Sequence, residues 1–190
     1  MATLFVDKID PQSGTTLSLG SSGDTLQATT GAINNIGIGM ADGWRLTANT
    51  NTGTADVVST NWERMDTNEF SQIGTGLTES SGVFTFPTTG IYWVHYNGRL
   101  TIDNGDTSAN YSLQTTNDNN TWSFAGYATG GNGSSANAAG SVSSNNIFDV
   151  QDTSNYKIRF ITGSFATDTN LNGSTNDNRT HFIVIRLGDT

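Results

Sequence analysis

The chain has 190 residues, of which only 13% are charged, and its formal net charge is −9 because its eight Lys and Arg residues are outnumbered by acidic ones. The basic residues stand singly, whereas phosphate neutralisation needs them clustered, so we expect no nucleic-acid partner. The absence of cysteine excludes disulfides and thiolate chemistry. No stretch approaches the roughly 20 apolar residues of a membrane span, so we expect no membrane insertion, and the N-terminus lacks the pattern of a signal peptide.

Residues 1–40 differ in pattern from the rest of the chain. The sequence S-G-x-T-L-x occurs at residues 13–18 and again at residues 22–27, and glycines beside aliphatic residues continue to residue 39. Short repeats of this kind become stable when they stack or wind with partner chains. We interpret residues 1–40 as a short β-rich stem that docks on a larger particle, and a flexible Gly/Ser linker is the alternative interpretation.

Residues 41–190 alternate short β-branched or aromatic runs with clusters of Gly, Asn, Asp and Ser, and no window shows a sustained helical period. This pattern predicts an all-β sandwich head. The expected strands lie at 43–46, 61–65, around Phe84, around Ile91, and at 109–114, 122–127, 147–150, 156–161 and 181–187. Between them, the Gly/Ser/Asn/Ala segment 129–146 is expected to form a long loop, which in a compact domain usually has a function.

Two of the expected strands, 91–96 and 181–187, are bulky and apolar at nearly every position. Continuous apolar runs are typical of strands that are buried on both faces, which an antiparallel sheet rarely has in an isolated monomer. In an all-β chain of this size, we expect the second face to be covered by another copy of the same chain.

The segment around these residues resembles the signature of C1q/TNF-like jelly rolls, in which a Phe is followed by Gly-x-Tyr-x-Phe-x-Tyr. The corresponding residues are Phe84, Gly90, Tyr92, Val94 and Tyr96, with Val94 in place of the second Phe. The resemblance implies an antiparallel jelly-roll sandwich that assembles as a homotrimer. It also implies that the final strand lies beside the strand after Gly90, in the inner sheet that lines a three-fold axis.

Strand alternation divides these residues between two faces, because successive side chains point to opposite sides. The family's recurring aromatics match Tyr92, Val94 and Tyr96, which are assigned to the sandwich interior. The residues predicted for the head core are Phe84, Phe86, Tyr92, Val94, Tyr96, Phe182 and Val184. The remaining set is assigned to the trimer interface: Trp93, His95, His181, Ile183 and Ile185. For the final strand, the alternation alone leaves open which of its two faces lines the axis.

Residues 5–20 resemble the N-termini of virion structural and tail-appendage proteins of marine bacteriophages. This resemblance implies a virion protein, either a trimeric fibre or appendage or a capsid-decoration protein, that contacts other virion proteins through the stem. Its head would attach to a host-surface glycan or protein. A carbohydrate-binding module without a virion role is the alternative.

Candidate chemistry is sparse. His95 and His181 are the only side chains that titrate near neutrality, both lie in expected strands, and no nucleophile motif accompanies them. We therefore predict a protein that is not an enzyme and has no cofactor.

Binding residues concentrate in loops on a rigid scaffold, so two loops are the expected receptor contacts. The first is the 103–108 turn with Asp103, Asn104 and Asp106, and the second is the long loop with Asn132, Ser134 and Asn137. The carboxylates of the turn also offer oxygen ligands for Ca²⁺, but an ordinary Asn-Gly hairpin turn explains them better, and no metal site is predicted.

A group of aromatic residues in the 122–127 strand has two interpretations. Trp122, Phe124 and Tyr127 either stack on a sugar or belong to the core, as aromatics in alternating strands usually do.

Overall fold

A computed structural model describes residues 38–190, except 52, 54–55, 68–69 and 167. The expected stem lies outside these residues. The chain divides into two units between residues 36 and 37, and all the described residues belong to the second unit. Throughout the described residues, the secondary structure consists of β-strands, turns and bends without helix. The all-β prediction is confirmed.

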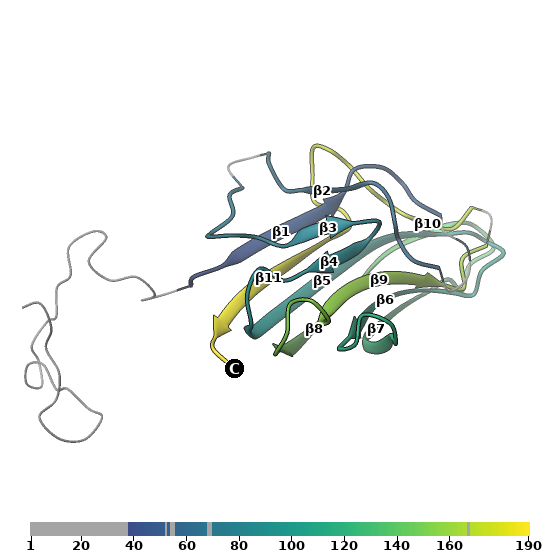
Figure 1. Cartoon of the computed structure of the whole chain (residues 1–190). Helices are drawn as coiled ribbons and strands as arrows, with labels where there is room; N and C mark the ends of the chain where they lie inside the picture. The colour runs from purple at the N-terminus through teal and green to yellow at the C-terminus, as the bar shows by residue number, and fades with distance from the viewer. Residues whose placement is uncertain (1–37, 52, 54–55, 68–69, 167) are drawn as a thin grey trace, which may run out of the picture. The chain divides into compact units, whose positions relative to one another are not determined.

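The strands of the head form two antiparallel sheets (Figure 1). Sheet A has the order β10-β5-β11-β1-β2, with β8 paired to β5, and sheet B has the order β3-β4-β9-β6-β7. The strand bounds are β1 Ala41–Leu46, β2 Trp62–Arg64, β3 Thr78–Ser80, β4 Val83–Thr85, β5 Gly90–Ile102, β6 Ser108–Thr116, β7 Ser123–Gly131, β8 Ala138–Val150, β9 Lys157–Gly163, β10 Asn170–Leu171 and β11 His181–Gly188.

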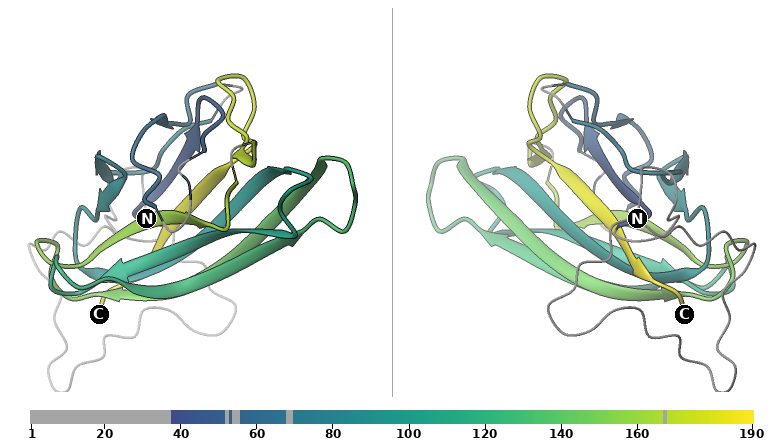
Figure 2. Two further views of the ribbon diagram at one scale, coloured as in Figure 1. Left: turned by 90° about the vertical axis from the view of Figure 1, so that its right-hand side faces the viewer. Right: turned by 90° about the vertical axis from the view of Figure 1, so that its left-hand side faces the viewer.

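Strand β5 is the centre of sheet A. It pairs with β8 from Gly90 to Ile102, and with β11 from Ile91 to Asn97. Near its end, it pairs with the short strand β10. The final strand therefore lies beside the strand after Gly90, as the family resemblance implies. The long strands β5 and β8 pair along their whole length, and β7 of sheet B lies beside β8. All three strands extend to the same end of the head (Figure 2).

A tight turn and a close approach of two backbones explain the glycines near the signature residues. Ser81 and Gly82, both with positive φ, form the two-residue turn between β3 and β4, which is the geometry that matches strand twist. Gly90 has φ 145°, and a Cβ there would lie 2.6 Å from the carbonyl oxygen of Gly188. Glycine is therefore required where β5 starts beside the end of β11.

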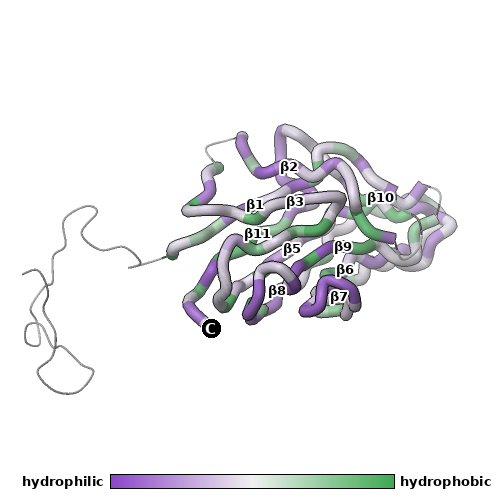
Figure 3. The backbone as a smooth tube through the Cα atoms, viewed as in Figure 1, coloured by the Kyte–Doolittle hydropathy of each residue, from purple (hydrophilic) through white to green (hydrophobic). Residues whose placement is uncertain are grey.

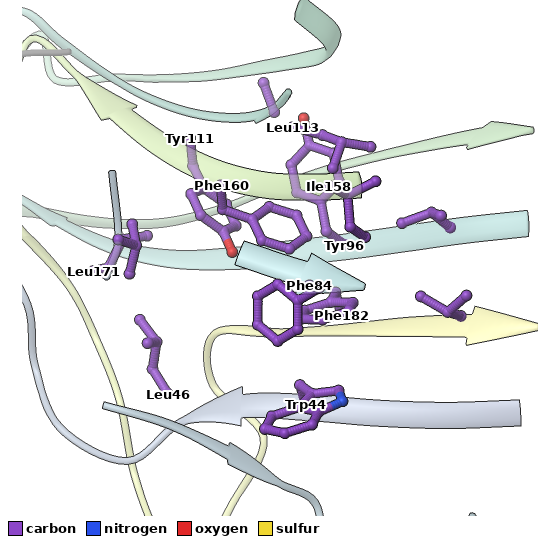
Figure 4. Close-up of a cluster of buried hydrophobic side chains, with 14 of the residues drawn as sticks. Trp44, Leu46, Phe84, Tyr96, Tyr111, Leu113, Ile158, Phe160, Leu171 and Phe182 are labelled. Carbon is purple, nitrogen blue, oxygen red and sulfur yellow. The ribbon is translucent and has the colours of Figure 1, made fainter. Parts of the chain in front are cut away.

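The core lies between the two sheets and is built on aromatic rings (Figure 4). Phe84 of β4 packs edge-on against Trp44 of β1, with ring centroids 5.3 Å apart, and against Phe182 of β11 at 4.7 Å. Phe160 of β9 lies 5.5 Å from Tyr96 of β5. Hydrophilic segments lie mainly in the connections and at the C-terminal end (Figure 3).

All seven residues assigned to the head core are buried. Each has a relative exposure of 2% or less. On β11, Phe182 and Val184 point into the sandwich, which answers the question that the sequence left open: His181, Ile183 and Ile185 point away from it. Met40 is also buried in this cluster, so the packed head begins before residue 41.

The prediction of a long loop at 129–146 is wrong. Strand β7 runs on to Gly131 and β8 begins at Ala138, which leaves only 132–137 as a connection. The Gly, Ser, Asn and Ala residues of β8 have low strand propensity, but all thirteen positions of β8 pair with β5, and this pairing supplies their backbone hydrogen bonds. Strand β7 approaches β8 closely, and a Cβ on Gly126 of β7 would lie 2.7 Å from Asn146 Nδ2 of β8.

Candidate functional site

The open face of sheet A, which points away from the core, is the first candidate site. Along β5 the burial alternates: Tyr92, Val94 and Tyr96 are fully buried, while Trp93 and His95 are only partly covered. Directly opposed residues of paired strands share one face of a sheet. The strand registers therefore place the side chains of the open face in rows that cross the strands.

The first row is apolar from one sheet edge to the other. Trp93 of β5 is opposed by Ile147 of β8 on one side and by Ile185 of β11 on the other. Ile185 is opposed in turn by Ala41, which bridges to Ile73. Ile147 is 70% exposed and Ile73 is 47% exposed. This row is a continuous apolar strip across four strands, in which Trp93, Ile185 and Ala41 are half-buried and Ile147 and Ile73 are exposed.

The second row mixes apolar and polar groups. It crosses the sheet through Asn145, His95, Ile183 and Gly43. The ring of His95 stacks on that of Trp93, with centroids 5.6 Å apart and an interplanar angle of 11°. Aromatic stacking of this kind holds both side chains in one orientation on the open face.

The third row is polar. It crosses the sheet through Ser143, Asn97, His181, Arg45 and Glu63. The Arg45 side chain is 1% exposed, and its Nε donates to Glu63 Oε1 at 2.7 Å. The open face therefore changes from apolar to polar along the strand direction.

A hollow of about 140 Å³ lies beside the apolar strip. Ala41, Gly43 and Ile183 line it from the sheet, and Met65 and Phe70 line it from the segment after β2. Phe70 is 47% exposed. Asp42, Arg64, Ser71 and Gln72 complete the lining, and the apolar residues offer a contact for one bulky side chain from a partner.

The two predicted histidines differ in their surroundings. Burial lowers the pKa of His181 below its usual value of 6.5, and the nearby His95 lowers it further, against opposing hydrogen bonds to the backbone at 178 and 179. At neutral pH, His181 is therefore an uncharged part of the face.

We expect the stability of the head to fall as the pH is lowered through the range in which His181 becomes protonated. The lowered pKa means that the unfolded chain takes up this proton first, so the contribution is complete above about pH 6.5 and is lost as the pH falls through the folded-state pKa. Urea midpoints measured between about pH 8 and pH 5 check this. Asp118, Asp152 and Asp177 also have pKa values below their usual value of 3.8. Their protonation therefore changes the stability only at pH values below this window.

The variant His181→Gln provides the control, because it keeps a polar side chain without the titration. Its midpoint should change less with pH than that of the parent. An identical pH dependence in both proteins would show that other groups cause the loss.

The predicted receptor loops meet at one end of the head and are bonded to one another. The backbone nitrogen of Asn104 donates to Asn137 Oδ1 at 3.1 Å, and its side chain donates to Ser135. Asp106 Oδ2 accepts from the backbone nitrogen of Ala166 at 2.8 Å and from Thr169 Oγ1. We call this end, made of the connections 103–107, 132–137 and 164–169 without residue 167, the loop tip.

The six predicted contact residues are not equivalent within the loop tip. Asn104, Ser134 and Asn137 are exposed, whereas Asp103 and Asp106 are partly covered. The prediction for Asn132 is wrong: this side chain is 6% exposed, and its Nδ2 donates to the carbonyl oxygens of Ile102, Asp103 and Ala136. Asn132 holds the connections together because a buried amide must satisfy its hydrogen bonds internally.

The aromatic residues near β7 divide between the two interpretations. The guanidinium of Arg159 lies 4.1 Å above the ring of Trp122, so Trp122 has a partner within the head. Phe124 and Tyr127 are 60% and 58% exposed. The sequence left the position of this pair open, because regular alternation places residues three apart on opposite faces of a strand. An irregularity in the pairing of β6 and β7 brings both rings to one face.

Comparisons with known structures address the fold. The head resembles murine APRIL crystallised at pH 5.0, with a TM-score of 0.59 and 14% identity over 78% of this chain and 98% of that chain. It also resembles the Eiger TNF of S. frugiperda, with a TM-score of 0.61 and 12% identity over 80% of this chain and 94% of that chain. The head has a TNF-like jelly-roll fold. No protein-family model and no curated protein matches the sequence.

Within residues 38–190, apart from the gaps given above, no three His, Cys, Asp or Glu side chains gather as metal ligands. None of the described segments is a helix long and apolar enough to cross a membrane.

Proposed function

We propose that the protein is a homotrimer in which the open face of sheet A is the subunit interface. The observation that carries this proposal is the apolar strip of Ile147, Trp93 and Ile185, which crosses the sheet beside the hollow lined by Met65 and Phe70. Exposed contiguous apolar surface of this kind marks interaction sites. The TNF-like fold supports the arrangement, because the inner sheet of that family lines a three-fold axis.

We further propose that the trimer is a non-enzymatic virion component of a bacteriophage. Residues 1–37 would dock on other virion proteins, and the head would face outward as a fibre, appendage or capsid decoration that attaches to the host surface. The support is the likeness of residues 5–20 to phage virion proteins, together with a head whose loops are tied into one rigid tip. A carbohydrate-binding module without a virion role is the second candidate, favoured by the exposed pair Phe124 and Tyr127.

A deletion of residues 1–37 tests both parts of the proposal. We expect the full chain to have about three times its mass of 20.1 kDa in light scattering, and the truncated chain to remain trimeric because the interface lies in the head. In phage particles that lack the native copy, only the full chain should be incorporated. The deletion stops before Met40 because that side chain belongs to the core.

The mass measurement and the incorporation assay can each contradict one part of the proposal. A monomeric full chain would refute the interface on sheet A. Normal incorporation of the truncated trimer would show that the head, and not the stem, carries the docking contacts.

A further inference from the structure

A second surface lies on the opposite side of the head, on the outward face of sheet B. There a hollow of about 220 Å³ is formed by β6, β7 and β9. Its lining includes Asn110, Ser112, Phe124, Tyr127, Ile161 and Ser164. We call it the β7 hollow. It shares Ser164 with the loop tip, but its other lining residues belong to neither the loop tip nor the open face of sheet A.

A β-bulge creates the aromatic wall of the β7 hollow. Phe124 opposes Gln114 and Gly126 opposes Leu113, so Ala125 is an extra residue in β7. The extra residue shifts the alternation and brings Phe124 and Tyr127 to the same face. Their ring centroids lie 5.9 Å apart with an interplanar angle of 69°, so the two rings stand as adjoining walls of a corner.

The floor and the far wall of the β7 hollow are made of neutral groups. Ser112 opposes Tyr127 on one side and Ile161 on the other, and both Ser112 and Ile161 are 5% exposed or less. Beside them, Asn110 Oδ1 accepts a hydrogen bond of 2.9 Å from Thr129 Oγ1, which fixes the amide. At the rim, Ser164 has φ 58°, a strained conformation for a residue other than glycine.

Among the residues that the structure describes, no charged side chain lines the β7 hollow. The nearest cation in the adjoining row is Arg159, whose Nε donates to Gln114 Oε1 at 2.8 Å while its guanidinium lies over Trp122. Arg159 is therefore engaged within the head. An anionic ligand would find no countercharge in the lining, and the net charge of −9 would oppose its approach.

The rings, the neutral polar groups and the volume of the β7 hollow together indicate the chemical class of its ligand. Exposed rings offer stacking surfaces to an apolar C–H face, and the amide and hydroxyl groups offer hydrogen bonds to hydroxyls. The volume is below the roughly 300–1,000 Å³ of pockets for drug-sized molecules. We propose that the β7 hollow binds one sugar ring of a neutral glycan. The inference deepens the proposed function, on which its biological role rests, by naming a neutral glycan as the host-surface ligand.

The experiment uses the full-length chain. Saturation-transfer NMR and calorimetry should show binding to at least one of a panel of neutral oligosaccharides ending in glucose, galactose, mannose, rhamnose, N-acetylglucosamine or N-acetylgalactosamine. Phe124→Ala and Tyr127→Ala should each weaken that binding about tenfold. Tyr127→Phe keeps the ring and should retain most of the affinity. Thr78→Ala, which changes an exposed residue of β3 at the opposite edge of sheet B from β7, is the matched control and should bind like the parent.

Three outcomes would overturn the inference: no binding to any neutral oligosaccharide, binding only to a sulfated oligosaccharide such as a heparin fragment, or a loss in Thr78→Ala as large as that in Phe124→Ala. Light scattering on the same samples separates this inference from the proposed function. A trimer that binds no glycan refutes the sugar site alone, whereas a monomer that binds glycan refutes the trimer alone.

Discussion

Trp93→Ala should give a protein that remains folded and β-rich but dissociates on dilution at concentrations where the parent stays trimeric. Trp93 lies at the centre of the apolar strip, between Ile147 and Ile185, and its ring is stacked on His95. A buried tryptophan at the centre of an interface is a typical hot spot, whose truncation costs about 2 kcal/mol or more per subunit. Sedimentation velocity over a dilution series measures the dissociation.

The matched control is Phe124→Ala, which removes an exposed aromatic ring from the other sheet. It should dissociate no more readily than the parent, because sheet B lies outside the proposed interface. Circular dichroism on both variants separates dissociation from unfolding. If Trp93→Ala keeps the assembly state and melting temperature of the parent, the open face of sheet A is not the interface.

The alternation of side chains explains why the sequence predicted most of the core. Tyr92, Val94 and Tyr96 are spaced by two, and the family signature identified them as the inward set. The same argument left β11 undecided because both of its faces are apolar. The structure decides it through register, since Phe182 opposes Tyr96 and Val184 opposes Val94. Register depends on tertiary pairing, which local periodicity does not contain.

The parts that the sequence could not provide depend on neighbouring strands. Strand β8 has few β-branched or aromatic residues before Ile147, and its extended conformation comes from pairing with β5. Asn132 has the composition of a loop residue, and only the surrounding carbonyl groups make it a buried connector. The bulge at Ala125 is visible only in the register between β6 and β7. For that reason the sequence left the sugar and core interpretations of Phe124 and Tyr127 open.

Asp42 shows the same limit for a charged residue. In the sequence it is one acidic residue among many, yet its side chain is buried at 3% exposure. Its carboxylate accepts hydrogen bonds from Trp44 Nε1 at 2.9 Å, from Arg64 Nε at 2.8 Å and from the backbone nitrogen of Leu77 at 2.8 Å. A buried carboxylate requires such compensation, and the partners come from three separate segments. The composition of the chain therefore does not indicate which acidic residue is buried, because this depends on partners that only the fold brings together.

Phe84→Ala should lower the free energy of unfolding of the head by about 3–5 kcal/mol. Phe84 is fully buried and links the two sheets, because its ring contacts Trp44, Trp62 and Phe182 of sheet A and Phe160 of sheet B. Truncation leaves a cavity among rigid rings that cannot close it. Urea unfolding monitored by tryptophan fluorescence measures the loss. Phe84→Leu, which keeps most of the volume, should lose clearly less. If both variants unfold at the urea midpoint of the parent, the two sheets do not pack on Phe84 as described. Because Phe84 points away from the open face of sheet A, any Phe84→Ala protein that still folds should remain trimeric, which distinguishes the core from the proposed interface.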